Sequence, residues 1–114
     1  MMHQFNQTMD YLEQQLTGEV DMKRFQQLSG YSYPLFSRLF SILADMTLAE
    51  YLRNRRLSEA VTDLREGSEK VIDIAMKYGY ESADAFSTAS KKFHGATPSE
   101  VRNGKPYRVF PRLQ

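Results

Sequence analysis

The side chains that could do chemistry in this chain are hydrogen-bonding and charged groups rather than nucleophiles or metal ligands. The 114 residues include no cysteine, and the two histidines, His3 and His94, stand alone. The sequence shows no evident pair of pocket-lining carboxylates and no glycine-rich phosphate loop. We therefore predict that the chain is not an enzyme and that it binds no metal and no cofactor.

Small polar and basic side chains follow two similar turns in the sequence. The stretches GYSYPLFSRLF, from Gly30, and GYESADAFSTASKKF, from Gly79, both begin with Gly-Tyr and continue with apolar residues at helical spacing. A helix-turn-helix unit needs a tight glycine turn and small polar residues where its second helix approaches base edges of DNA. The repeat favours two such units, although helical hairpins with glycine turns are also common in plain bundles.

The elements that would position these side chains are helices. Periodicity predicts an all-α fold of about seven helices, with two helix-turn-helix subdomains joined by a long central helix of roughly 27 Å. Expected N-caps are Asp21, Ser32, Thr47, Ser68, Ser82 and Thr97, and Gly18 is expected to end the first helix in a left-handed conformation. Thr47 with Glu50, and Thr97 with Glu100, fit the capping box. The expected apolar stripes are Leu35, Phe36, Leu39, Phe40 and Leu43 in the third helix, and Val71, Ile72, Ile74 and Ala75 in the fifth. Tyr31 and Tyr80 are expected to be buried.

The pattern resembles the AraC/XylS-type DNA-binding domain over roughly residues 6–103. The first unit carries Ser32, Phe36, Arg38 and Phe40, followed by Tyr51-Leu52 and Arg56-Leu57. The second carries VIDIAMKYGYESADAFS (71–87) and KKFHGATPSEVR (91–102). The sequence departs from the family pattern at three positions: Asp45 stands where glycine is usual, so that an aspartate would make an unusual turn, Thr88 where arginine is frequent, and Ser90 where phenylalanine is usual.

The resemblance implies a DNA-binding domain over residues 1–104. Its first helix-turn-helix unit would cover about 21–44, its linker helix about 47–66 and its second unit about 68–94. Residues 105–114 would be a tail or a linker to an effector domain that is absent from this chain. The tail carries a β-prone run, Tyr107, Val109 and Phe110; the alternative is a segment that packs on the last helix of a complete chain.

The resemblance also implies which residues contact DNA. Base-edge contacts are expected from Tyr33, Pro34, Ser37, Arg38, Ser41, Ala83, Asp84, Ser87, Thr88 and Lys91. Phosphate contacts are expected from Ser32, Arg53, Ser82, Lys92 and Thr97. Arg38 could bind guanine in a bidentate manner, or it could pair with Asp45 or touch phosphate only. Asp84 could accept a hydrogen bond from cytosine or cap its helix, the latter being favoured.

The partner implied is double-stranded DNA, with RNA polymerase as a second partner and a small-molecule effector acting through the absent domain. The net charge is only +1, but residues 91–114 carry six Lys or Arg against one Glu. No apolar run approaches the ~20 residues of a membrane helix, and we expect a cytoplasmic, bacterial, nucleoid-associated protein. The alternative function is a helical protein-interaction module without DNA readout, in which the charge excess is incidental.

Overall fold

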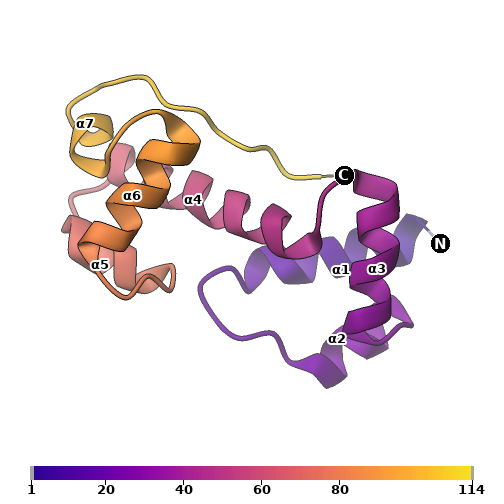
Figure 1. The fold of residues 1–114 in the computed structure, drawn as a ribbon. Coiled ribbons are helices and arrows are strands. Elements are labelled where there is room, and N and C mark those ends of the chain that lie inside the picture. The colour runs from indigo at the N-terminus through magenta and orange to yellow at the C-terminus, as the bar shows by residue number, and fades with distance from the viewer. Residues whose placement is uncertain (1, 114) are drawn as a thin grey trace. The chain divides into compact units, whose positions relative to one another are not determined.

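All regular structure in the chain is α-helical (Figure 1), as seen in a computed structural model that describes residues 2–113. The helices are α1 (Met2–Gln14), α2 (Met22–Ser29), α3 (Tyr33–Ala44), α4 (Leu48–Glu66), α5 (Val71–Lys77), α6 (Ala83–His94) and α7 (Pro98–Arg102). Over the described residues this confirms the predicted all-α fold with seven helices. Met1 and Gln114, the outer ends of the two predicted ranges, lie outside the described residues. None of the described helices has the length and apolar character of a membrane span.

The chain forms two compact units. Unit 1 comprises the residues up to Arg53 together with Arg112 and Leu113, and unit 2 comprises Asn54–Pro111. The boundary falls within α4, so that the first turns of this helix belong to unit 1 and the remainder to unit 2.

The second helix of each helix-turn-helix unit has the same length and the same kind of start. α3 and α6 both contain 12 residues and begin 50 residues apart in the sequence. Each has a serine N-cap: the Ser32 hydroxyl accepts from the amide of Leu35 at 3.4 Å, and the Ser82 hydroxyl from the amide of Ala85 at 3.0 Å. These bonds satisfy amides that the first helical turn leaves without a partner.

α3 and α6 also end in the same way. Asp45 follows α3 with φ 58°, and Gly95 follows α6 with φ 79°. Asp45 is the one non-glycine residue with positive φ among the described residues, which confirms the unusual turn expected there. An aspartate tolerates the left-handed conformation better than most residues, but glycine adopts it at lower cost.

Unit 1 has an aromatic core. Phe25 of α2 meets Phe36 of α3 edge to face at 5.0 Å between ring centroids, and Phe40 lies 5.4 Å from Tyr51 of α4. The other buried apolar residues of unit 1 are Met9, Leu12, Leu16, Leu48 and Leu52. α1 and α2 therefore pack against α3 at Phe36, and the first turns of α4 pack against it at Phe40.

The buried stripe of α3 is narrower than predicted. Leu35, Leu39 and Leu43 are exposed, and so is Tyr31 in the turn before the helix. These leucines lie on the flank of α3, beyond the strip that α1 and α2 cover. The prediction that they would be buried is wrong, because spacing along a helix does not show how wide a surface its neighbours cover.

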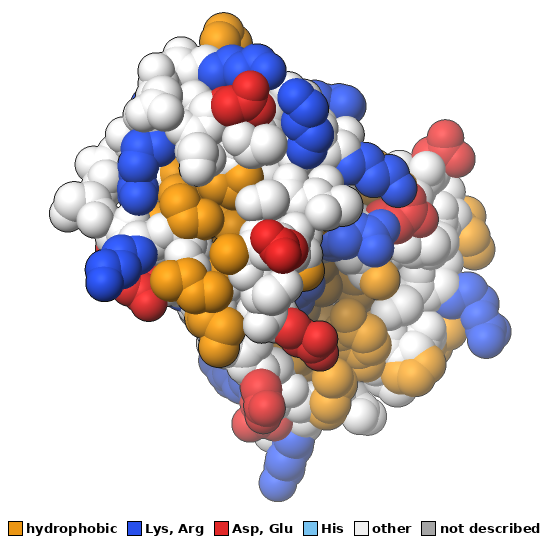
Figure 2. All heavy atoms as spheres, turned by 60° about the vertical axis from the view of Figure 1, so that its left-hand side comes forward, with side chains coloured by type: hydrophobic (Ala, Val, Ile, Leu, Met, Phe, Trp, Pro, Cys, Tyr) orange, Lys and Arg blue, Asp and Glu red, His pale blue; other side chains and the backbone are white. Residues whose placement is uncertain are grey.

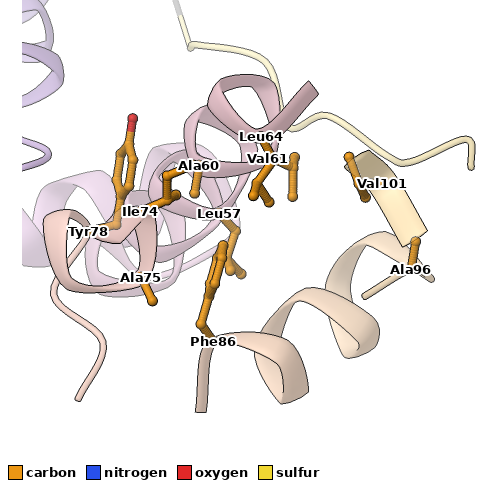
Figure 3. Close-up of a cluster of buried hydrophobic side chains, with 10 residues drawn as sticks. All are labelled: Leu57, Ala60, Val61, Leu64, Ile74, Ala75, Tyr78, Phe86, Ala96 and Val101. Carbon is orange, nitrogen blue, oxygen red and sulfur yellow. The ribbon is translucent and has the colours of Figure 1, made fainter. Parts of the chain in front are cut away.

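Unit 2 has a mainly aliphatic core in which side chains of four helices and of the two loops that follow α5 and α6 point toward one another (Figure 3). Its buried members are Leu57, Ala60, Val61 and Leu64 of α4, Ile74 and Ala75 of α5, Tyr78, Phe86 of α6, Ala96 and Val101 of α7. The Tyr78 hydroxyl donates to Asp63 at 2.7 Å, which ties the end of α5 to α4. Tyr80 packs half-buried against this core, whereas Ile72, expected in the apolar stripe of α5, is exposed.

Two predicted helix ends and one predicted cap differ from those observed. α1 ends at Gln14, and Gly18 lies in the following turn without a positive φ. α5 begins at Val71 rather than after Ser68, because the loop continues to Lys70, which provides no side-chain cap. At α4 only half of the capping box forms: the Thr47 hydroxyl accepts from the amide of Glu50 and donates to its carboxylate, both at 3.0 Å.

The C-terminal segment, residues 105–113, contains no strand. A strand needs a partner for its backbone groups, and the described chain offers only helices here, so side chains take that role. The amide of Phe110 donates to the Ser58 hydroxyl at 2.7 Å, and the carbonyl of Phe110 accepts from Arg55. The carbonyl of Lys105 accepts from Arg65 at 2.6 Å. The β-prone run of the sequence is therefore an extended segment held by α4 of unit 2.

Candidate nucleic-acid interface

α3, the second helix of the first predicted helix-turn-helix unit, exposes two of its five residues that are expected to contact base edges. Pro34 and Arg38 are exposed, whereas Tyr33, Ser37 and Ser41 are half-buried. The Tyr33 ring lies 5.1 Å from that of Phe25, which turns it toward the core of unit 1. The Ser41 hydroxyl donates to the carbonyl of Ser37 at 3.0 Å, a bond within the helix that a base would have to replace.

Arg38 is the long cationic side chain on this face. It lies six positions after the N-cap Ser32, and no ion pair joins it to Asp45 within the described residues. Its guanidinium therefore remains available for the planar, two-bond contact that arginine makes with the O6 and N7 atoms of guanine.

α6, the second helix of the second predicted unit, exposes side chains of both charges and a neutral one among its base-edge candidates. Asp84, Thr88 and Lys91 are exposed, and Ala83 and Ser87 are half-buried. The N-cap is Ser82, so the expectation that Asp84 caps the helix is wrong. Asp84 lies instead in the first turn, where a carboxylate is stabilised by the positive end of the helix dipole.

The residues that are expected to contact phosphate differ in whether their donor groups are free to bind it. Arg53 of α4 and Lys92 of α6 are exposed. The hydroxyls of Ser32 and Ser82 are occupied as N-caps. The amide of Thr97 donates to the Glu100 carboxylate at 2.9 Å in a complete capping box, so the start of α7 already binds an anionic group of its own chain.

Glu100 is a residue beside the interface whose second role the sequence pattern did not reveal. Its carboxylate lies 3.7 Å from the Lys91 amine and 3.2 Å from the Lys105 amine. Hydrogen bonds from the backbone of Thr97, and then from Lys105, lower the pKa of Glu100 to about 2. A permanent negative charge therefore lies next to Lys91. The capping-box motif predicted the bond to Thr97, but nothing in the sequence indicated the pairing with Lys91.

Positive and negative side chains are interspersed on the face of the molecule that Figure 2 shows. Blue Lys and Arg side chains alternate there with red Asp and Glu side chains, and hydrophobic side chains lie between them. This face therefore has no continuous basic stripe, in agreement with a net charge of +1.

The departure from the family pattern at Ser90 is accommodated inside unit 2. Ser90 is fully buried, and its hydroxyl donates to the carbonyl of Ala96 at 2.7 Å. The bond joins the last turns of α6 to the loop before α7. A polar side chain at this position therefore has a partner, and α6 keeps its place on the core that contains Phe86.

Comparison with known proteins identifies the family. A family model described as a helix-turn-helix domain matches residues 25–104. The HTH-type transcriptional activator AarP of Providencia stuartii is 36% identical over 92 residues, which cover 81% of this chain and 68% of the relative. The regulatory protein SoxS of Escherichia coli (strain K12) is 35% identical over 94 residues, which cover 82% and 84%.

Solved structures agree in fold. An AraC-type transcriptional regulator from Chromobacterium violaceum superposes with a TM-score of 0.76 at 21% identity, covering 88% of this chain and 89% of that one. The DNA-binding domain of AdpA, in complex with a target DNA, superposes with a TM-score of 0.70 at 19% identity, covering 86% and 88%. Together with the family match and the relatives, these findings show that the chain belongs to the AraC/XylS-type helix-turn-helix family of DNA-binding transcriptional regulators, and that it is not an enzyme.

Proposed function

We propose that this chain binds DNA sequence-specifically by placing α3 and α6 in two adjacent segments of the major groove. The observation that carries the proposal is the repeat of α3 and α6: two 12-residue helices, each N-capped by serine, with exposed polar or charged side chains at matching positions. Arg38 of α3 and Thr88 of α6 occupy equivalent positions, and both are exposed. Because both reading helices belong to one chain, the site can be asymmetric and a dimer is unnecessary.

The interface is unequal in its two halves. α3 offers a guanidinium at Arg38, which suits guanine, whereas α6 offers the methyl group of Thr88, which suits thymine, together with Lys91. The carboxylates of Asp84 and Glu100 lie close to the Thr88 and Lys91 side of the interface and would repel phosphate. We therefore expect α3 to contribute more of the base discrimination than α6.

A titration followed by fluorescence anisotropy tests the proposal. Genomic DNA fragments are first selected for binding, and one selected duplex is then titrated with the full chain against a scrambled duplex at two salt concentrations. Specific affinity at least about a thousandfold above the scrambled duplex supports sequence readout. Equal affinity for both duplexes, or none, would instead favour the helical protein-interaction module.

A footprint on the selected duplex tests the two-helix arrangement. Protection of two major-groove segments about one helical turn apart, on one face, supports the engagement of both helices. Protection confined to one half-turn would rule out that arrangement while leaving specific binding intact.

The proposal also covers the location of the protein in the cell and its partners other than DNA. A regulator of this family would act in the bacterial cytoplasm on nucleoid DNA, with RNA polymerase as its second partner. A small-molecule effector would act through a further domain outside this chain. Transcription in a purified system, with the selected site placed upstream of a promoter, tests the first part: a change in transcript level on adding the chain supports contact with the polymerase or occlusion of it.

A further inference from the structure

Lys91 and Glu100 form an ion pair at the edge of the surface that α6 is proposed to present to DNA. The pair lies within unit 2 and spans the turn from α6 to α7, with the Lys91 amine 3.7 Å from the Oε1 atom of Glu100. Ion pairs between two flexible, exposed side chains are weak, because both side chains must be ordered to form them. The strength of this pair therefore depends on whether one of its members is already held in place.

The Glu100 carboxylate is held by contacts other than the one with Lys91. Its Oε1 atom accepts from the backbone amide of Thr97 at 2.9 Å, and its Oε2 atom accepts from the Lys105 amine at 3.2 Å. With a pKa of about 2, the carboxylate keeps its charge at neutral pH. Lys91, an exposed residue, thus has an anionic partner that is already in position.

In the proposed arrangement Lys91 is better placed for a contact with the DNA backbone than with a base. A recognition helix contacts base edges with its N-terminal residues. Lys91 is the ninth of the 12 residues of α6, about two turns beyond Asp84. Its amine is a compact charge on a flexible stem, which suits a phosphate. Because phosphate contacts carry no sequence information, a restraint on Lys91 would lower the affinity for every duplex without changing the preference among them.

Unit 1 contains the corresponding carboxylate without the lysine. An offset of 50 residues matches α3 with α6 and the Thr-x-x-Glu of the first capping box with that of the second, so that Glu50 corresponds to Glu100. At the same offset Lys91 corresponds to Ser41, which carries no charge. An ion pair between these two positions is therefore possible only in unit 2.

We propose that Glu100 is a positioning residue that restrains Lys91 and thereby limits the sequence-independent affinity of the chain for DNA. This inference rests on the proposed function, because it requires that α6 approaches the major groove. In the free protein the Lys91 amine is paired with a carboxylate, and a DNA phosphate has to replace that carboxylate as its partner. The exchange reduces what the phosphate contact contributes, for selected and for unselected DNA alike. Base preference is left to the other exposed side chains of α3 and α6.

Glu100→Gln tests the restraint, because it removes the charge while the amide oxygen of glutamine can still accept from Thr97 in the capping box. The full chain and the variant are titrated with the selected and the scrambled duplex, followed by fluorescence anisotropy, at about 50 and about 200 mM salt. One added phosphate contact steepens the salt dependence by about one, so the affinity of the variant should fall roughly threefold more than that of the parent between these concentrations. At the lower salt concentration the variant should bind both duplexes more tightly, by a similar factor.

Lys91→Ala, made in both backgrounds, isolates the part that Lys91 plays. In the double variant the added affinity and the steeper salt dependence of Glu100→Gln should both disappear, because no lysine is left to bind the phosphate. The matched control is Glu50→Gln, which removes the same charge from the corresponding position of unit 1 and should change the salt dependence much less. Circular dichroism verifies that each variant keeps its helical fold.

Two results would overturn this inference while the proposed function stands. The first is specific binding by the parent chain together with an unchanged salt dependence in Glu100→Gln. The second is a gain in affinity that persists in the double variant or is matched by Glu50→Gln, since the carboxylate would then act by direct repulsion of DNA. Absence of DNA binding by the parent chain would instead overturn the proposed function, and this inference with it.

Discussion

Ser90 donates its hydroxyl hydrogen bond to the carbonyl of Ala96 over 2.7 Å, and both residues are completely buried. The bond spans the left-handed turn at Gly95 and so fixes the path of the chain from α6 to α7. In α3 the equivalent position is Phe40, which fills the core of unit 1 instead. The two units thus use the same helical position in different ways, one for an apolar contact and one for a backbone partner.

Replacing Ser90 by alanine should destabilise the protein. The variant leaves the buried carbonyl of Ala96 without its partner, which costs about 1–3 kcal/mol of the free energy of unfolding. Urea denaturation measures this as a lower midpoint with an unchanged slope. Ser87→Ala, a half-buried serine of the same helix, is the control and should change the midpoint little. Equal midpoints for both variants would show that the Ser90 bond does not stabilise the fold.

Replacing Asp45 by glycine should stabilise the protein. It holds a left-handed conformation at φ 58°, which costs a non-glycine residue energy, so Asp45→Gly should raise the free energy of unfolding by up to about 1 kcal/mol. Asp45→Val should lower it by about 1–2 kcal/mol, because a branched side chain is strained there. The matched control is Gly95→Ala at the equivalent position of α6: no atom lies within 4 Å of the added methyl group, so only backbone strain should appear. Thermal unfolding compares the variants, and a stabilising Asp45→Val would contradict the explanation.

Local chemistry made several elements predictable from the sequence. The N-caps at Ser32, Ser82 and Thr97 form as expected, because each depends on residues within one helical turn. The long helix after Thr47 and the glycine end of α6 follow from equally local signals. The burial of Phe36 and Phe86 follows from apolar spacing alone.

The features that the sequence did not predict depend on contacts between residues that lie far apart in the chain. Periodicity placed Leu39 and Leu43 in the core, but only the packing of α1 against α3 decides how much of α3 is covered. The extended path of the C-terminal segment depends on Arg55 and Ser58, more than 50 residues earlier in the chain. The pairing of Lys91 with Glu100 likewise follows from the turn that brings α7 beside α6. Which base each exposed side chain contacts stays a prediction.

The capping box of α7 should stabilise unit 2. Thr97→Ala removes the hydroxyl that accepts from the amide of Glu100 at 3.3 Å, and should lower the free energy of unfolding by roughly 0.5–2 kcal/mol. DNA affinity should fall as well, because α7 follows the end of α6 directly. Ser99→Ala, an exposed serine inside the same helix, is the control. An unchanged denaturation midpoint for Thr97→Ala would reject a stabilising role for the box.

His94 should make stability depend on pH. Burial lowers the pKa of His94 below its usual value, and hydrogen bonding to the backbone carbonyl of Arg108 opposes this shift only in part. Because the folded-state pKa is lower than the unfolded-state value of about 6.5, the neutral ring stabilises the fold fully above that pH. This stabilisation is lost as the pH falls through the folded-state pKa.

Urea denaturation of the parent chain and of His94→Gln at pH 7.5 and pH 5.5 measures the effect. The parent should lose more of its free energy of unfolding between the two pH values than the variant does. Comparing the two proteins removes the contribution of the carboxylates, which titrate in both. A larger loss in the variant would mean that protonation of His94 stabilises the fold.

Arg38 should carry base discrimination if α3 reads the major groove. Arg38→Ala is then expected to cost about 1–3 kcal/mol in binding the selected duplex, and to relax the preference at one base position. Arg38→Lys should recover part of the affinity but not the preference, because an ammonium group cannot make the planar two-bond contact with guanine. Competition anisotropy against duplexes that vary one base pair at a time measures both effects. The control is Lys23→Ala, which removes one positive charge from the exposed surface of α2 in the same unit.

The alternative role for Arg38 is contact with phosphate, and salt dependence separates the two. A phosphate contact would weaken binding to every duplex by a similar factor and reduce the salt slope by about one, whereas a base contact changes the ranking of the duplexes. Because Arg38 is exposed and forms no ion pair with Asp45, neither result can be attributed to a rearranged core. If affinity, preference and salt slope are all unchanged in Arg38→Ala, Arg38 lies outside the DNA interface, and α3 would have to read DNA through Pro34 and the half-buried serines, which offer little discrimination.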